Sequence, residues 1–303
     1  MSSINFRWLC CFMIFNGLYL GILSQELIID SVATQFTKVN GFTSGIEGPA
    51  VGRDGKLFAV NYYEQGTIGM VDSNGHCSLF ARLPGESIGN GIRFDRKGNM
   101  FIADYMQHNI LIVEDGSVNV QVFAHEDLMN QPNDIAIDSK GRIFASDPNW
   151  EEGTGQLWLI STEGKVELLE KGMGTTNGIE INPEEDRLYV NESNQLRIWA
   201  YDLDQKGGIF NKTLFYQFED YGLDGMRCDQ AGNLFVTRYG KGTVLVLSPN
   251  GGVLAEVILT GKRPSNLAFG GPDGKTLYVT LADKGCFDSF RTSIPGRSFS
   301  MWK

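Results

Sequence analysis

Six residues with oxygen-bearing side chains recur at nearly even spacing along the sequence, and two of them are carboxylates. They are Glu47, Asn90, Asn133, Asn177, Asp224 and Asn266, separated by 43, 43, 44, 47 and 42 residues. Carboxylate and amide oxygens without histidine or cysteine favour a hard divalent cation, Ca²⁺ before Zn²⁺. If the fold brings Glu47 and Asp224 together, their charges repel unless one is protonated or a cation lies between them.

The segments that follow these polar residues are alike, and each alternates short β-rich runs with turns. After Asn90, strands are predicted at residues 90–95, 100–104, 109–114 and 119–124. A period near 44 residues with four short strands per repeat is typical of β-propeller blades. Glycine or proline interrupts the runs about every ten residues, which argues against long helices. The sequence therefore predicts an all-β, six-bladed β-propeller.

The two ends of the chain are predicted to close the ring of blades. The last repeat supplies only three strands, whereas residues 31–39 form a free strand before the first repeat. This N-terminal strand can complete the sixth blade from outside and protect the seam. We therefore expect a single domain over residues 25–303.

The propeller arrangement predicts where the polar residues meet. The first strand of each blade lines the central channel, and the end of the second strand lies at the same mouth because the two strands are antiparallel. The second strands therefore add Asp104, Asp147, Asn191, Arg238 and Asp283 around that mouth. An alternative remains for Asn90 and Asn266, because asparagine is also common in turns, and the ring could hold no metal.

Residues 1–24 differ from the rest of the chain and resemble a secretory signal peptide. Arg7 precedes an apolar stretch at residues 8–23, which ends at Ser24. We expect a secreted or periplasmic protein, with a membrane tether formed by residues 8–23 as the alternative. Outside this leader the cysteines are Cys77, Cys228 and Cys286, and a bridge between Cys77 and Cys286 is conceivable.

Charge restricts the partners of the mature chain. The 303 residues carry a formal net charge of −10, with an isoelectric point near 4.9. Nucleic acid is not an expected partner, because no basic patch is available to neutralise phosphates. Without a run of lysine or arginine, an anionic membrane surface is not expected either after the signal is removed.

Four motifs resemble those of the senescence marker protein/gluconolactonase family, the regucalcin-like lactonases. They are Glu47-Gly48-Pro49, QPNDIAID with Asn133, TTNGIEIN with Asn177 and LDGMRCD with Asp224. The resemblance covers residues 31–303 approximately. It implies that Glu47, Asn177 and Asp224 hold a metal ion and that Asn133 contacts metal, substrate or water.

The resemblance also implies hydrolysis of a lactone, most simply a sugar lactone such as gluconolactone. The metal, with Ca²⁺ favoured over Mg²⁺ or Zn²⁺, would polarise the carbonyl group. Asp224 would hold or deprotonate the attacking water, or attack directly, and Asn133 would be a ligand or position the substrate. Two other functions remain open: a promiscuous esterase or organophosphate hydrolase at the same site, and a secreted, non-catalytic Ca²⁺-binding propeller.

Four further residues are weaker candidates for substrate contacts: Asn90, Asp147, Arg238 and His108. Arg238 could neutralise an acidic substrate or be an ordinary surface arginine. His108 could relay a proton or be a plain loop residue. Some members of the family carry arginine where this chain has Gln131, so the resemblance does not imply their preference for sugar acids.

Overall fold

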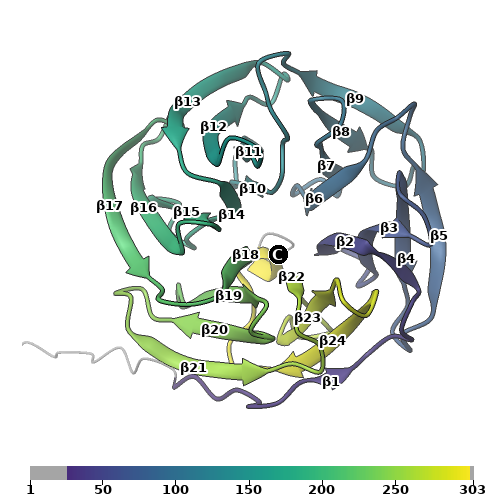
Figure 1. Cartoon of the computed structure of the whole chain (residues 1–303). Helices are drawn as coiled ribbons and strands as arrows, with labels where there is room; N and C mark the ends of the chain where they lie inside the picture. Colours follow the sequence, from purple (N-terminus) through teal and green to yellow (C-terminus); the bar gives the residue numbers. More distant parts are fainter. Residues whose placement is uncertain (1–25, 301–303) are drawn as a thin grey trace, which may run out of the picture.

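The computed structural model describes residues 26–300, which form six four-stranded sheets around a central axis (Figure 1). The first two blades contain β2 (Phe42–Val51), β3 (Leu57–Tyr62), β4 (Thr67–Val71) and β5 (Cys77–Arg82), then β6 (Gly89–Phe94), β7 (Met100–Asp104), β8 (Asn109–Val113) and β9 (Val120–His125). The next two contain β10 (Ile135–Ile137), β11 (Ile143–Asn149), β12 (Thr154–Ile160) and β13 (Val166–Met173), then β14 (Thr176–Ile181), β15 (Arg187–Glu192), β16 (Arg197–Leu203) and β17 (Ile209–Gln217).

The fifth blade contains β18 (Gly222–Cys228), β19 (Leu234–Tyr239), β20 (Thr243–Leu247) and β21 (Val253–Ile258). The sixth contains β22 (Pro264–Gly270), β23 (Thr276–Leu281), β24 (Cys286–Arg291) and the N-terminal β1 (Thr34–Gln35). A single turn of helix, α1 (Arg297–Ser300), follows near the axis (Figure 1). The predicted six-bladed propeller is confirmed, and the strands predicted in the second blade agree with β6–β9 to within a residue.

A recurring aspartate explains why the first two strands of a blade form a tight hairpin. Asp95 Oδ1 accepts hydrogen bonds from the backbone N–H groups of Lys97 and Asn99, both at 2.9 Å. Asp138 and Asp229 make the same pattern in the third and fifth blades. A side chain that replaces the missing backbone acceptor stabilises the turn before the second strand starts.

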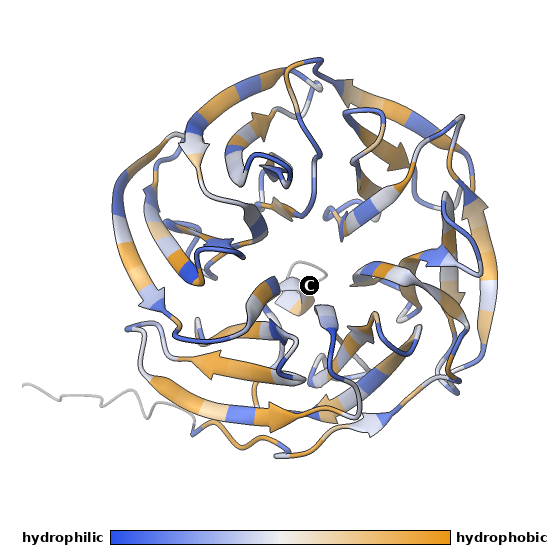
Figure 2. Cartoon of the chain, viewed as in Figure 1, coloured by the Kyte–Doolittle hydropathy of each residue, from blue (hydrophilic) through white to orange (hydrophobic). Residues whose placement is uncertain are grey.

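The hydrophobic core lies between neighbouring blades rather than at the axis. Buried side chains form six clusters, and apolar stretches alternate with polar ones along the sheets (Figure 2). Between the first and second blades, for example, Val60 packs with Ile92, Ile102 and Leu111, all fully buried. Because each sheet buries both faces against its neighbours, the blades hold one another in place.

The N-terminal segment closes the ring as predicted. β1 pairs antiparallel with β24, with Thr34 opposite Ser289 and Gln35 opposite Asp288. The backbone N–H of Ala33 donates to the carbonyl of Ile258 in the fifth blade at 2.8 Å. The segment therefore covers the edge of β24 and also touches the preceding blade (Figure 1).

Two sequence predictions concern the N-terminal leader and the cysteines. The predicted leader, residues 1–24, lies outside the described residues. Within residues 26–300, no helix has the length and apolar character of a membrane span. Cys77, Cys228 and Cys286 are free thiols, so the conceivable bridge between Cys77 and Cys286 is absent. Burial raises the pKa of Cys286 to about 12, which keeps it a thiol.

Replacing Ala33 with aspartate should open the seam between the last blade and the N-terminal strand. Ala33 is 3% exposed and packs in the core between blades five and six, so Ala33→Asp buries an unpaired carboxylate. We expect the free energy of unfolding to fall by about 3 kcal/mol, measured by urea denaturation. The control is Thr34→Asp, because Thr34 is the next residue along the chain and its side chain is exposed to solvent. Equal losses in the two variants would show that the inward contact of Ala33 does not matter.

Candidate active site

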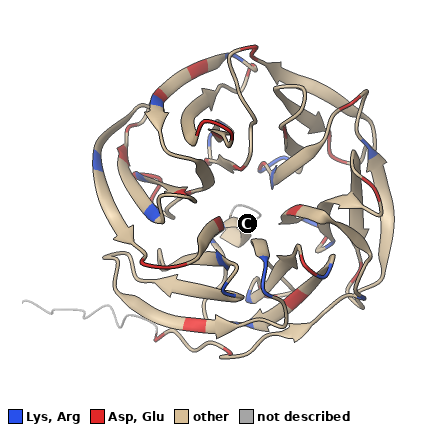
Figure 3. Cartoon of the chain, in the orientation of Figure 1, with Lys and Arg blue, Asp and Glu red and all other residues tan. Residues whose placement is uncertain are grey.

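The starts of the inner strands meet at one mouth of the channel and form a cavity of about 410 Å³. Its lining includes five of the six recurring polar residues: Glu47, Asn90, Asn133, Asn177 and Asp224. Figure 3 shows acidic positions on β2 and β18 beside the central opening. The structure thus brings together the residues that the repeat predicted to converge.

Local irregularities in the inner strands aim these residues into the channel. The register between the first and second strands shifts around Glu47, between Gly89 and Ile92, between Thr176 and Ile179, and between Leu223 and Met226. Such bulges leave a residue without a cross-strand partner and turn its side chain. The polar residues therefore do not follow the alternation of a regular strand.

The glycines that follow the polar residues have a packing role. A Cβ at Gly178 would lie 2.2 Å from the carbonyl oxygen of Asp224, and one at Gly225 would lie 1.9 Å from Asn266 Oδ1. A Cβ at Gly48 would lie 2.0 Å from the carbonyl oxygen of Asn90. The Asn-Gly and Asp-Gly pairs therefore mark close approaches between neighbouring inner strands, rather than turns.

Hydrogen bonds hold the site residues in place. Glu47 Oε2 accepts from the backbone N–H of Gly48 at 2.5 Å and from Asn266 Nδ2 at 2.9 Å. Asn177 Nδ2 donates to Ser193 Oγ at 3.0 Å, and Ser193 donates in turn to the carbonyl of Leu223. The amide nitrogen of Asn177 thereby has a fixed partner, which restrains the side chain at the cavity that it lines.

The carboxyl groups of Glu47 and Asp224 are electrostatically coupled. Burial, and then the charge of Asp134, raise the pKa of Glu47 to about 7. Burial, the charge of Glu47 and a hydrogen bond between the two carboxyl groups raise the pKa of Asp224 well above its usual range. The site therefore favours either a shared proton or a bound cation over two bare carboxylates.

Aromatic and amide side chains form the walls of the opening. An adjoining hollow shares six lining residues with the cavity: Glu47, Asn90, Asn133, Trp150, Asp224 and Tyr239. Its further lining includes Asn61, Gln65, Tyr105 and Gln131. Neither lining contains lysine, arginine or histidine among the described residues. The opening thus presents neutral hydrogen-bonding groups and aromatic faces above two acidic residues.

Comparison with known proteins assigns the chain to a family. Residues 46–283 match the sequence model of the SMP-30/Gluconolactonase/LRE-like region. The chain belongs to this family. The match begins just before Glu47 and ends just after the second strand of the last blade, so it includes all six repeats.

Relatives in this family include sugar-lactone lactonases. The gluconolactonase of Zymomonas mobilis is 34% identical over 134 residues, covering 41% of this chain and 37% of the relative. The pentonolactonase XacC of Haloferax volcanii is 32% identical over 131 residues, covering 42% and 45%. The chain thus matches less than half the length of each of these curated relatives.

Solved structures share the fold at lower identity. A calcium-binding protein, regucalcin, from Agrobacterium tumefaciens aligns with a TM-score of 0.75 and 20% identity. The alignment covers 88% of this chain and 97% of that protein. This likeness supports the six-bladed architecture.

The structure does not bring three of the weaker candidates into the cavity. Asp147 is fully buried and accepts hydrogen bonds from Asn130, Gln131, Gln156 and Trp158. Arg238 is buried, pairs with Asp220 at 2.7 Å and lies over the ring of Phe218. His108 occupies a turn with a φ of 55°. The hydrogen bonds of Asp147 and the ion pair of Arg238 indicate structural roles for both residues. Of the four weaker candidates, only Asn90 lines the cavity.

At several strand ends, the residue that lines the site lies one position away from the residue that the sequence predicted. The prediction placed Asp104, Arg238 and Asp283 around the mouth, whereas the lining residues are their neighbours Tyr105, Tyr239 and Ala282. Adjacent residues of a strand face opposite sides, so a shift of one position exchanges an inward for an outward side chain. Trp150 had no signal beyond following the second strand of its blade.

The donor set of the cavity fits a hard cation. Within residues 26–300, no three histidine, cysteine, aspartate or glutamate side chains lie close enough together to hold a metal ion. The cavity instead offers two carboxylates, Glu47 and Asp224, together with the amide oxygens of Asn133 and Asn177. Oxygen donors of this kind suit Ca²⁺ better than a transition metal.

The metal-free protein should lose stability as the pH rises through the range in which Glu47 titrates. Its pKa rises from 4.5 to about 7 on folding, so the folded state binds the proton more tightly. The stabilisation is therefore complete below pH 4.5 and is lost as the pH approaches and passes 7. We expect the melting temperature in EDTA to fall between about pH 5 and pH 7.5, measured by calorimetry.

The matched variant Glu47→Gln should flatten this part of the profile, because glutamine does not titrate. Added Ca²⁺ should oppose the loss in the wild type near neutral pH, since the ion replaces the proton. An unchanged slope in Glu47→Gln would assign the pH dependence to other groups.

Proposed function

We propose that the protein is a metal-dependent hydrolase that opens a sugar lactone, with Ca²⁺ as the favoured ion. The observation that carries this proposal is the coupled pair Glu47 and Asp224 in a cavity that also contains Asn133 and Asn177. The carboxylate pair offers two negative charges, which match the +2 charge of the ion. Sugar-lactone lactonases among the relatives support the reaction class.

Glu47, Asn177 and Asp224 would hold the ion, with Asn133 as a further ligand or a contact to the substrate. When bound, the ion polarises the lactone carbonyl and stabilises the negative charge that develops on its oxygen. Asp224 holds the attacking water and accepts its proton as the new carbon–oxygen bond forms. The proton then passes to the ring oxygen as its bond to the carbonyl carbon breaks, which yields the open hydroxy acid.

The walls of the cavity and of its adjoining hollow favour a neutral, polyhydroxylated substrate. Gln65, Gln131 and Asn90 can exchange hydrogen bonds with sugar hydroxyl groups. Trp150 and Tyr239 offer aromatic faces that can cover the C–H face of a sugar ring. Because the lining has no cationic side chain among the described residues, a sulfonate or phosphate group on the substrate would lack a counter-charge.

The proposed location is outside the cytoplasm, in the periplasm or the medium, with the tether through residues 8–23 as the alternative. This proposal rests on the predicted leader alone. Fractionation of the full-length chain and N-terminal sequencing of the mature product would test it.

Metal removal and restoration should control the activity. With gluconolactone, EDTA should reduce proton release to the spontaneous rate, and Ca²⁺ should restore it better than Mg²⁺ or Zn²⁺. Asp224→Asn should lower kcat by a factor of about 10²–10⁴ without unfolding the protein.

The matched control is Asp115→Asn, the same exchange in an exposed turn between β8 and β9. It should retain wild-type kcat. No metal-restored turnover of any γ- or δ-lactone by folded, metal-loaded protein would contradict the proposal and favour a binding propeller.

The residue at position 131 should determine whether the protein prefers neutral or anionic lactones. Wild-type protein should open neutral aldonolactones faster than their 6-phosphorylated or 6-sulfonated forms, because the cavity lacks a counter-charge. Gln131→Arg should raise kcat/KM for the anionic lactones relative to the neutral ones by about tenfold. The control Gln121→Arg adds the same charge on the exposed face of β9. A similar change in both variants would attribute the effect to net charge alone.

A further inference from the structure

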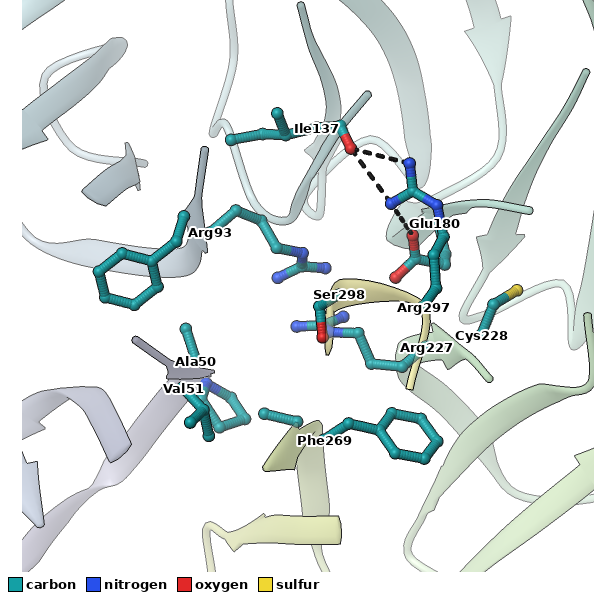
Figure 4. A pocket seen from close by; sticks show the side chains of 13 residues that line it. Ala50, Val51, Arg93, Ile137, Glu180, Arg227, Cys228, Phe269, Arg297 and Ser298 are labelled. Carbon is teal, nitrogen blue, oxygen red and sulfur yellow. Dashed lines mark hydrogen bonds and ion pairs between the residues drawn. The ribbon is translucent and has the colours of Figure 1, made fainter. Parts of the chain in front are cut away.

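A second chamber of about 50 Å³ lies on the axis beyond the active-site residues, between the inner strands and α1. Its walls combine apolar residues such as Val51 and Phe269 with the charged residues Arg93, Glu180, Arg227 and Arg297 (Figure 4). None of these residues takes part in the proposed lactone chemistry.

The charged residues reach the chamber by the same repeat that forms the active site. Arg93, Glu180 and Arg227 each follow an active-site residue by three positions, on β6, β14 and β18. In the other blades the corresponding residues are uncharged: Ala50, Ala136 and Phe269. The bulge in each inner strand turns both positions inward, so a second charged layer lies below the first.

Two of the arginines at the chamber share a single carboxylate. Arg93 Nη1 lies 3.1 Å from Asp134 Oδ1, and Arg227 Nη1 lies 3.3 Å from Asp134 Oδ2, so one carboxylate serves two guanidinium groups. Arg297 is held elsewhere, by Glu185 at 2.8 Å, by Glu180 at 3.6 Å and by a backbone carbonyl. Figure 4 shows Arg93 and Arg227 extending toward the middle of the chamber, while Arg297 turns to Ile137 and Glu180.

Arg227 has an unused donor in this setting. It is 6% exposed, and its Nη2 atom has no hydrogen-bond partner within the described part of the chain. Burial, and then the positive charge of Arg93, lower its pKa to about 10. A buried donor without an acceptor, next to a like charge, is unfavourable unless a further group supplies both an acceptor and a negative charge.

We propose that the chamber binds a small monovalent anion of the halide type, such as chloride, between Arg93 and Arg227. A volume of about 50 Å³ exceeds the roughly 10–15 Å³ that one water needs. Its apolar walls favour an ion that gives up its water shell readily over a strongly hydrated phosphate. Ser298 lines the chamber and is exposed, which gives the ion a route from solvent.

The anion would act on the fold rather than on the reaction. It would join β6 and β18 across the axis by neutralising the two guanidinium groups, and so stabilise the folded state. The inference stands independently of the proposed lactonase activity, because neither arginine lines the active-site cavity.

The test is a bromide titration of EDTA-treated full-length protein, with sodium sulfate keeping the ionic strength constant. Saturable stabilisation is expected, with a rise in melting temperature of about 5 °C at a hundredfold excess over the dissociation constant. Arg227→Met should abolish the saturable rise. The control Arg82→Met removes an exposed arginine paired with Glu64 and should keep the rise.

Crystals grown in sodium bromide provide a second measurement that does not depend on the folding of a variant. The expected result is an anomalous peak between the guanidinium groups of Arg93 and Arg227. Water alone at this position, or a bromide effect that Arg227→Met leaves unchanged, would overturn the assignment. A peak with phosphate but not with bromide would also overturn it, since the chamber would then select a different class of anion.

Discussion

The close approach of the inner strands around the axis is the constraint on which the rest of the structure depends. Neighbouring strands come so near that a Cβ at Gly48, Gly178 or Gly225 would overlap the next blade. At this spacing the backbones fill the ring, and the polar residue before each glycine has only the channel to occupy. Convergence of the polar residues is therefore a packing result before it is a chemical one.

Crowding at the axis also orders the charges along it. Glu47 and Asp224 lie at the open mouth, Asp134 lies below them, and Arg93 and Arg227 contact Asp134 from the far side. Burial alone would raise the pKa of Asp134, but the charges of these two arginines lower it below its usual value. Asn266 connects the layers, since its Nδ2 donates to Glu47 at 2.9 Å and to Asp134 at 3.4 Å. Each layer thus sets the electrostatic environment of the next.

The ring holds this column of charges only because it is closed. Every blade buries both faces, and the last blade lacks an outer strand until β1 pairs with β24. α1 adds a second closure at the axis, where Arg297 reaches Glu185 and the carbonyl of Ile137. Residues from the two ends of the chain therefore stabilise a site that neither end contributes to directly.

The sequence by itself determined the number of blades and the polar residues at the open mouth, because the 42- to 47-residue repeat places Glu47, Asn133, Asn177 and Asp224 in register. It did not determine which neighbours line the walls, since in a strand one step in register exchanges inside for outside. Tyr105 and Tyr239 line the hollow that adjoins the cavity, where Asp104 and Arg238 were expected. Only the tertiary structure gave Asp147 its buried donors and Arg238 its ion pair with Asp220, because those partners are chosen by packing between segments that local pattern does not connect.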